Sequence, residues 1–224
     1  MNDLVLITSV INTGTQPWSY TGKRSMYNPD QRFQQTLQTI DSIRVYLPSA
    51  KILLVECSEI PDDFTKTLLT KTDYFINLYE YEYVRNACLE TNKKGYGEAV
   101  QTKFAVEFIL QNKLVFSRMF KISGRYFFTE KFHQENYAND RFTFKRRADT
   151  HDGTISISTV VFSFPYSLLE HFYKSVCSVV HYYETQGPRG YEELLPILCE
   201  PRQEIEILGV SGYVAVPPVV FFSA

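Results

Sequence analysis

The sequence predicts a single α/β domain with a mostly parallel central sheet flanked by helices, and a smaller mixed or antiparallel C-terminal part. Strand-like and helix-like segments alternate through the first half of the chain, which is the order of parallel strands joined by right-handed crossovers. A hydrophobic fraction of 44% with 21% charged residues is normal for a globular domain. The length of 224 residues is enough for one substantial core, so we expect residues 1–224 to form one domain.

The first predicted strand covers residues 4–10, where an apolar run suits both faces of a central parallel strand. Residues 12–27 then predict a loop of unusual length, because glycine, proline and hydroxyl side chains interrupt any regular pattern. Loops this long in compact domains are usually functional or disordered. Lys23 and Arg24 lie in this loop, where they either contact phosphate or remain solvated.

A strong helix start follows the loop. Asn28 can cap the helix, Pro29 suits its first position, and Gln31 can complete a capping box. Pro48 ends this helix. We then expect, in order, a strand at residues 51–57, a short helix from Pro61, a strand at residues 73–78 and a mixed segment at residues 79–91.

The stretch 92–99 and the strand after its helix form the centre of the predicted site. Two closely spaced glycines lead into a helix whose apolar residues recur at helical spacing. Residues 114–122 are rich in β-forming side chains and then reach a Ser-Gly pair, so a buried strand ends in a turn that presents Arg125 and Tyr126. Open α/β sheets bind ligands beyond the carboxyl ends of their strands, so this turn points polar residues at the expected site.

The second half of the chain predicts shorter and less regular elements. Residues 141–146 alternate in a way that is typical of an edge strand, and His151-Asp152-Gly153 predicts a turn before a strand at residues 155–162. The remaining expectations are a helix from Pro165, an interruption at residues 187–190, a short helix from Tyr191 that Pro196 bends or limits, and a closing strand or hairpin at residues 204–216.

Composition argues against several classes of function. The formal net charge of −2 removes the general electrostatic basis for nucleic-acid binding, although it does not exclude a local basic patch. No apolar run approaches the roughly 20 residues that cross a bilayer, so we expect no transmembrane segment and a cytoplasmic location. The four cysteines form no close pair and the four histidines lack ligand spacing, so we expect buried thiols and no zinc site. The 16 Tyr and 17 Phe fit either an aromatic core or exposed platforms for sugar rings or bases.

On these motifs the chain resembles the GT-A-type glycosyltransferases, which use nucleotide sugars and have one Rossmann-like α/β domain. It is particularly similar to small bacterial and viral enzymes that build surface glycans. The matching positions are Thr8, Ser9 and Val10 in the first strand, Glu56, Cys57 and Ser58 at the end of the second, Asn92, Gly95, Gly97 and Ala99 before the long helix, residues 120–126, and Glu192-Glu193 at a late helix start. The resemblance implies that residues 1–126 bind the nucleotide sugar and that residues 127–224 form the acceptor side. The implied donor-binding residues are Thr8, Ser9, Val10, Glu56, Lys94, Gly95, Lys121, Ser123, Gly124 and Arg125.

The chain departs from this family at the metal-binding motif. Ser123-Gly124-Arg125 stands where the family usually has Asp-x-Asp, so the segment has no carboxylate to bind a cation between diphosphate oxygens. The family's Mn²⁺ or Mg²⁺ cofactor is therefore an open question for this chain. A guanidinium can neutralise a leaving diphosphate without a metal, so Arg125, with Lys121 or Lys94, is the alternative. A structural arginine paired with a neighbouring acid is the other interpretation of Arg125.

An inverting transfer needs a general base for the acceptor hydroxyl. The resemblance gives Glu193 or Glu192 this role, although acids at a helix start are also favoured by the helix dipole, and His151-Asp152 is a second candidate pair. The implied reaction moves a hexose or deoxyhexose from a nucleotide diphosphate sugar, preferably a UDP-sugar, to a glycan acceptor with inversion. A nucleotidyltransferase and a non-catalytic module that binds nucleotide sugars are the two alternatives.

Overall fold

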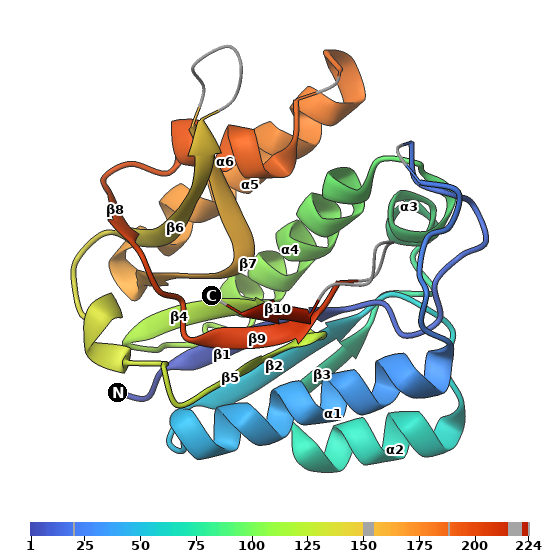
Figure 1. Ribbon diagram of the computed structural model, residues 1–224, viewed down its shortest axis with the longest axis horizontal. Coiled ribbons are helices and arrows are strands. Elements are labelled where there is room, and N and C mark those ends of the chain that lie inside the picture. Colours follow the sequence, from blue (N-terminus) through green and yellow to red (C-terminus); the bar gives the residue numbers. More distant parts are fainter. Residues whose placement is uncertain (20, 150–154, 188, 215–220, 224) are drawn as a thin grey trace.

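The computed structural model describes residues 1–19, 21–149, 155–187, 189–214 and 221–223. Its centre is a seven-stranded sheet in the order β3-β2-β1-β4-β7-β6-β8, and a smaller sheet has the order β10-β9-β5 (Figure 1). The strands are β1 Leu4–Ser9, β2 Lys51–Glu56, β3 Tyr74–Asn77, β4 Arg118–Ser123, β5 Tyr126–Phe128, β6 Phe142–Asp149, β7 Ile155–Pro165, β8 Arg202–Ile205, β9 Val210–Tyr213 and β10 Phe221–Ser223. The helices are α1 Pro29–Tyr46, α2 Asp62–Lys71, α3 Glu82–Arg85, the π-helix η1 Asn86–Glu90, α4 Lys94–Gln111, the 3₁₀ turns η2 Gln134–Tyr137 and η3 Tyr166–Leu168, α5 Leu169–Thr185 and α6 Tyr191–Leu198.

Strands β1 to β4 confirm the predicted parallel half of the sheet. β1 pairs in parallel with both β2 and β4, and β2 pairs in parallel with β3. All residues of β1 are buried, and its apolar side chains alternate between two cores. Leu4 and Leu6 join the core that α4 and α5 cover, whereas Val5 and Ile7 join the core that α1 and α2 cover (Figure 1). A central strand apolar on both faces is therefore what the two helix layers require.

Helix α1 begins as the sequence predicts. The Asn28 side chain accepts a hydrogen bond from the Gln31 backbone N–H at 2.9 Å, and the Gln31 side chain accepts one from the Asn28 N–H at 3.0 Å. This capping box satisfies two of the N–H groups that a helix start leaves without partners. Phe33 then stacks on Phe64 of α2 with ring centroids 3.8 Å apart, which fixes the two helices on the same face of the sheet.

Two predictions about the second half are wrong. The predicted edge strand at residues 141–146 begins β6, which lies between β7 and β8, because residues 202–205 pair with it in parallel. The strand or hairpin predicted at residues 204–216 is instead divided between the two sheets, since β8 joins the large sheet and β9 pairs with β5 in the small one. The predicted turn His151-Asp152-Gly153 lies outside the described residues.

The glycine-containing stretch lies inside α4. This helix begins at Lys94, so Gly95 and Gly97 occupy its first turns, and part of the mixed segment before it forms α3 and η1. A Cβ atom at Gly97 would lie 2.7 Å from the Ala87 carbonyl oxygen, so the glycine lets α4 pack directly on η1. None of the helices in the described part of the chain is long and apolar enough to cross a membrane.

Candidate functional site

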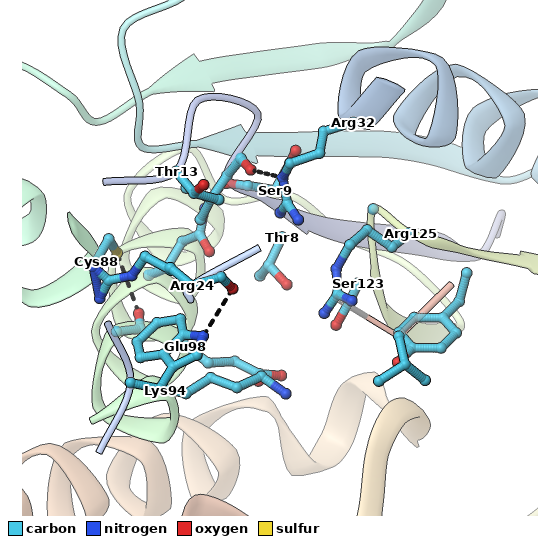
Figure 2. Close-up of a pocket in the computed structure, with 17 residues that line it drawn as sticks. Thr8, Ser9, Thr13, Arg24, Arg32, Cys88, Lys94, Glu98, Ser123 and Arg125 are labelled. Atoms are coloured by element: carbon cyan, nitrogen blue, oxygen red, sulfur yellow. Dashed lines mark hydrogen bonds between the residues drawn. The ribbon is translucent and has the colours of Figure 1, made fainter. Parts of the chain in front are cut away.

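A cavity opens at the carboxyl ends of β1 and β4, where α4, the loop after β1 and the end of β9 meet (Figure 2). In the described part of the chain, four cationic side chains line it: Arg24, Arg32, Lys94 and Arg125. Among the described residues around it, Glu98 is the one carboxylate. The cavity lies where open α/β sheets bind ligands, and its surplus of positive charge favours an anion.

Arg125 is held in place by the backbone of the small sheet. Its Nη1 donates to the Tyr213 carbonyl oxygen at 2.8 Å, and the Tyr213 N–H donates to the Arg125 carbonyl oxygen at 3.1 Å. The preceding residue is also fixed, because the Gly124 N–H donates to the Thr8 carbonyl oxygen at 2.9 Å. The turn after β4 is thus secured between β1 and β9, and the guanidinium is presented to the cavity (Figure 2).

Arg32 reaches the same cavity from α1, although it is almost completely buried. Its Nε donates to the Val10 carbonyl oxygen at the end of β1. Burial, together with the positive charge of Arg125, lowers the pKa of Arg32 to about 9. The lowered pKa means that the folded protein destabilises this cation, and a bound anion would offset the cost.

Arg24 and Trp18 form another part of the wall, from the loop after β1. The Arg24 guanidinium donates to the carbonyl oxygens of Leu89 and Thr91, and it lies 3.8 Å from the centre of the Trp18 ring. The Trp18 indole N–H donates back to the Arg24 carbonyl oxygen at 3.0 Å. The Arg24 Nε is buried and has no hydrogen-bond partner within the described residues. This wall therefore has one unsatisfied donor on a cationic side chain.

A buried ion pair lies below the cavity. Lys121 of β4 is fully buried and pairs with Glu98 of α4. Its ammonium also donates to the Ser123 hydroxyl and the Thr159 carbonyl oxygen, both at 3.1 Å. Burial opposes ionisation of Glu98, but the charges of Lys121 and Lys94 outweigh it and hold the pKa of Glu98 below its ordinary value. Burial lowers the pKa of Lys121, and Glu98 opposes that shift.

Seven of the ten predicted donor-binding residues lie together at the cavity: Thr8, Ser9, Val10, Lys94, Ser123, Gly124 and Arg125. The other three do not line it. Lys121 is buried behind the lining residues, where its ammonium donates hydrogen bonds to Glu98 and Ser123. Gly95 faces α5 and α6 instead, since a Cβ atom there would lie 2.3 Å from the Tyr183 hydroxyl.

Glu56, the third of these residues, is fully buried at the end of β2. Its Oε1 accepts hydrogen bonds from the Ser58 hydroxyl at 2.6 Å and from the backbone N–H groups of Ser58 and Ile11 at 2.9 and 3.1 Å. These bonds join the chain segments that follow β1 and β2. The carboxylate therefore fixes the start of the loop after β1, and direct contact with a nucleoside would require it to give up these partners.

The two acids predicted as catalytic bases, Glu192 and Glu193, lie in the first turn of α6 and are not among the residues lining the cavity. Glu193 accepts a hydrogen bond from the Gly190 N–H at 3.4 Å, which caps its own helix. Acids at this position also suit the helix dipole. Their role as a base stays a prediction.

Sequence reasoning missed several residues at the site. Arg32 sits at a buried position of α1, Glu98 follows the second glycine of α4, and Trp18 lies in the long loop. Gln101, one turn after Glu98, donates to the carbonyl oxygens of Ser9 and Val55 at 2.7 and 2.8 Å. The available signal for Glu98 and Gln101 was their spacing from Lys94, because positions 94, 98 and 101 share one helix face.

The residues at the end of β4 do not fit a divalent cation. Such ions need several oxygen ligands, usually carboxylates, whereas Ser123 and Gly124 are followed by the guanidinium of Arg125. Glu98, which is the one carboxylate that the described residues bring to the cavity, is paired with Lys121. Nowhere in the described ranges do three or more His, Cys, Asp or Glu side chains gather into a group that could hold a metal.

No protein-family model matches the sequence, and no curated protein matches it either. The fold does have relatives among solved structures. The chain is similar to the glycosyltransferase GlyE of Streptococcus pneumoniae, with a TM-score of 0.50 and 9% identity over 92% of this chain and 45% of that one. It is also similar to a nucleoside-diphosphate-sugar pyrophosphorylase of Vibrio cholerae, with a TM-score of 0.53 and 12% identity over 92% of this chain and 93% of that one. The chain thus spans less than half of GlyE, and at these identities the likeness shows a GT-A-type fold.

Proposed function

We propose that the protein is a glycosyltransferase that uses a nucleotide diphosphate sugar and binds the diphosphate with basic side chains. The observation that carries this proposal is the charge of the cavity, where Arg24, Arg32, Lys94 and Arg125 surround the ends of β1 and β4. Charge-assisted hydrogen bonds from guanidinium groups suit phosphate oxygens in geometry as well as in charge. The GT-A-type fold supports the same assignment, since it brings the cavity to the ligand-binding edge of the sheet.

In the proposed reaction an acceptor hydroxyl oxygen forms a bond to the anomeric carbon of the sugar. The bond from that carbon to the diphosphate breaks, and its electron pair leaves with the phosphate oxygen. Arg125 is fixed by Tyr213 at the end of β4, so it can stabilise this developing charge without a change of position. The proton of the acceptor hydroxyl passes to a general base, for which Glu193 and Glu192 stay the predicted candidates. A hexose or deoxyhexose donor, the UDP group, a glycan acceptor, inversion and a cytoplasmic location are further parts of this proposal.

A nucleotidyltransferase is the second candidate, because the pyrophosphorylase of Vibrio cholerae shares the fold over most of both chains. That class usually has a glycine-rich basic loop directly after the first strand. Here Thr13-Gly14-Thr15 is a poor version of it, and the arginine of the loop, Arg24, is bound to the carbonyl oxygens of Leu89 and Thr91. The positive charge of the cavity fits both enzyme classes. The sequence of the loop after β1 favours a glycosyltransferase over a nucleotidyltransferase.

Calorimetric titration tests the diphosphate site. We expect UDP or GDP, and the matching sugar nucleotide, to bind the wild-type protein in the presence of EDTA. Arg125→Gln should weaken this binding by about 10-fold to 100-fold, since it removes charge-assisted hydrogen bonds worth roughly 1.5–3 kcal/mol. Arg141→Gln is the matched control, because Arg141 is an exposed arginine outside the cavity and should leave the affinity unchanged.

Product analysis then separates the two enzyme classes. A glycosyltransferase releases UDP or GDP from a sugar nucleotide when a glycan acceptor is present, whereas a nucleotidyltransferase releases pyrophosphate from a nucleoside triphosphate and a sugar 1-phosphate. Nucleotide binding that requires Mn²⁺ and is unchanged by Arg125→Gln would overturn the proposal of a metal-free diphosphate site. Absence of nucleotide binding under both conditions would overturn the proposed function.

A further inference from the structure

Glu98 differs from the rest of the cavity in charge. Within the part of the chain that the structure describes, it is the one carboxylate on a wall that also carries Arg24, Arg32, Lys94 and Arg125. Its side chain is 15% exposed, so it lies at the surface of the cavity and is still largely enclosed. A carboxylate repels phosphate, so a diphosphate held by the arginines gives no reason for an acid here.

The acid is held rigidly by Lys121. The Lys121 ammonium is fully buried, and its three donors are used by Glu98 Oε1, the Ser123 hydroxyl and the Thr159 carbonyl oxygen. A buried ion pair is tolerated when its remaining donors are satisfied in this way. Lys121 therefore links β4, β7 and α4, and it fixes the carboxylate next to the turn that carries Arg125.

The free side of the carboxylate belongs to the cavity. Lys121 donates to Oε1, and no hydrogen bond to Oε2 comes from the described residues. Glu98 lies one helical turn after Lys94, and the two charges interact. Figure 2 shows both on the side of the cavity opposite Arg32. A ligand whose diphosphate contacts the arginines and Lys94 would thus place its neighbouring group against Glu98.

We propose that Glu98 binds hydroxyl groups of the donor sugar and so distinguishes a sugar nucleotide from the free nucleotide. Adjacent hydroxyls of a sugar ring are neutral donors that match the acceptor oxygens of a carboxylate. Lys121 acts as the positioning residue that keeps the carboxylate ionised and oriented. This inference rests on the proposed function and adds to it the residue that recognises the sugar.

The test compares Glu98→Gln with the wild-type protein by calorimetry. The probes are UDP, GDP, UDP-glucose, UDP-galactose, UDP-N-acetylglucosamine and GDP-mannose. We expect Glu98→Gln to weaken the tightest sugar nucleotide by about 10-fold to 100-fold, because an amide nitrogen replaces the second acceptor oxygen. The affinity for the matching free nucleotide should change by less than about 2-fold, since that part of the ligand contacts the arginines.

Two further variants keep the test decisive. The pair Glu98→Gln with Lys121→Met leaves no buried charge without a partner, so it guards against loss of folding and should show the same selective weakening. Glu107→Gln alters an acid of the same helix that pairs with Lys103 outside the cavity, and it should change neither affinity.

The outcomes separate this inference from the proposed function. Equal weakening of nucleotide and sugar nucleotide by Glu98→Gln, or no weakening of either, would overturn the sugar contact alone. Binding of UDP or GDP by the wild-type protein without binding of any sugar nucleotide would overturn it as well. Absence of all nucleotide binding would overturn the proposed function together with the inference.

Discussion

Asp73 connects three elements of the fold through single hydrogen bonds. Its Oδ1 accepts from the Lys51 ammonium at 2.7 Å, and its Oδ2 accepts from the Arg44 guanidinium and the Ile52 N–H, both at 2.9 Å. Burial opposes ionisation, but these hydrogen bonds outweigh it and lower the pKa of Asp73. One carboxylate just before β3 thus ties the end of α1 to the start of β2.

We expect Asp73→Asn to destabilise the protein by about 1–2 kcal/mol at neutral pH, a modest cost because Arg44 and Lys51 are exposed to solvent. The pKa of Asp73 is lower in the folded protein than the ordinary value of 3.8, so its contribution is complete at neutral pH and is lost as the pH falls from 3.8 through the folded value. Urea unfolding at neutral pH and at about pH 3 measures the difference between variant and wild type, which should shrink at the lower pH.

Asp41→Asn is the control for this experiment, since Asp41 is exposed and pairs with Lys71 at the surface. It should cost less than about 0.5 kcal/mol at either pH. If Asp73→Asn lowers the free energy of unfolding by the same amount at both pH values, the charge of Asp73 does not stabilise the fold.

Among single residues, the sequence predicts a member of the site when that residue comes directly after a recognisable strand. Arg125 was found in this way, because a Ser-Gly pair after a β-rich run marks where the strand stops. Arg32 was not, since a charged residue in a helix is usually taken to face solvent, and only the packing of α1 against the end of β1 turns it inward. Glu56 is the opposite case: it was predicted from its position at a strand end, but its carboxylate is bound by Ser58 in the loop that follows the strand.

Among the elements, α4 and η1 pack closely beside the site. A Cβ atom at Gly97 would lie 2.7 Å from the Ala87 carbonyl oxygen and 3.0 Å from the Cys88 Cα. Both obstacles are backbone atoms, so rotation of a side chain cannot relieve them. Gly97 and Cys88 also line the cavity, which means that the spacing of the two helices sets part of its width.

Gly97→Ala should therefore lower the free energy of unfolding by about 1–3 kcal/mol, even though alanine favours a helix by up to about 1 kcal/mol. It should also weaken nucleotide binding, because α4 must move away from η1. Thermal unfolding and calorimetry check the two effects. Gly22→Ala is the matched control, since a Cβ atom there meets nothing within 4 Å. A Gly97→Ala protein as stable as wild type would contradict the close packing.

Elements that their own residue pattern defines were predicted better than elements whose place depends on which strand they pair with. The parallel strands, α1 and its cap follow from local periodicity and capping chemistry. The short strands β8 and β9 do not, because each has four residues and its sheet is chosen by a distant partner. The pattern of residues 204–216 indicates extended chain, and it contains nothing that assigns the two strands to different sheets.

For the whole molecule, the cavity collects side chains from residue 8 to residue 214. It exists only when β1, α1, α4, β4 and β9 have assembled, so a ligand bound there stabilises the complete fold. The same assembly brings Arg32 and Arg125 close enough for like charges to lower the pKa of Arg32 further after burial. The free protein therefore carries an electrostatic strain that a diphosphate would relieve.

The last prediction follows from this strain. At about 100 times its dissociation constant, UDP should stabilise the wild-type protein by roughly 2.7 kcal/mol, or about 5–11 °C in the unfolding midpoint for a domain of this length. If GDP binds more tightly in calorimetry, it replaces UDP here. Uridine or guanosine at the same concentration lacks the phosphates and should produce a much smaller shift. The shift should also decrease as salt rises, because ions screen the attraction between the arginines and the diphosphate. A nucleoside that stabilises the protein as much as its diphosphate would place the binding energy in the base and contradict the role given to the arginines.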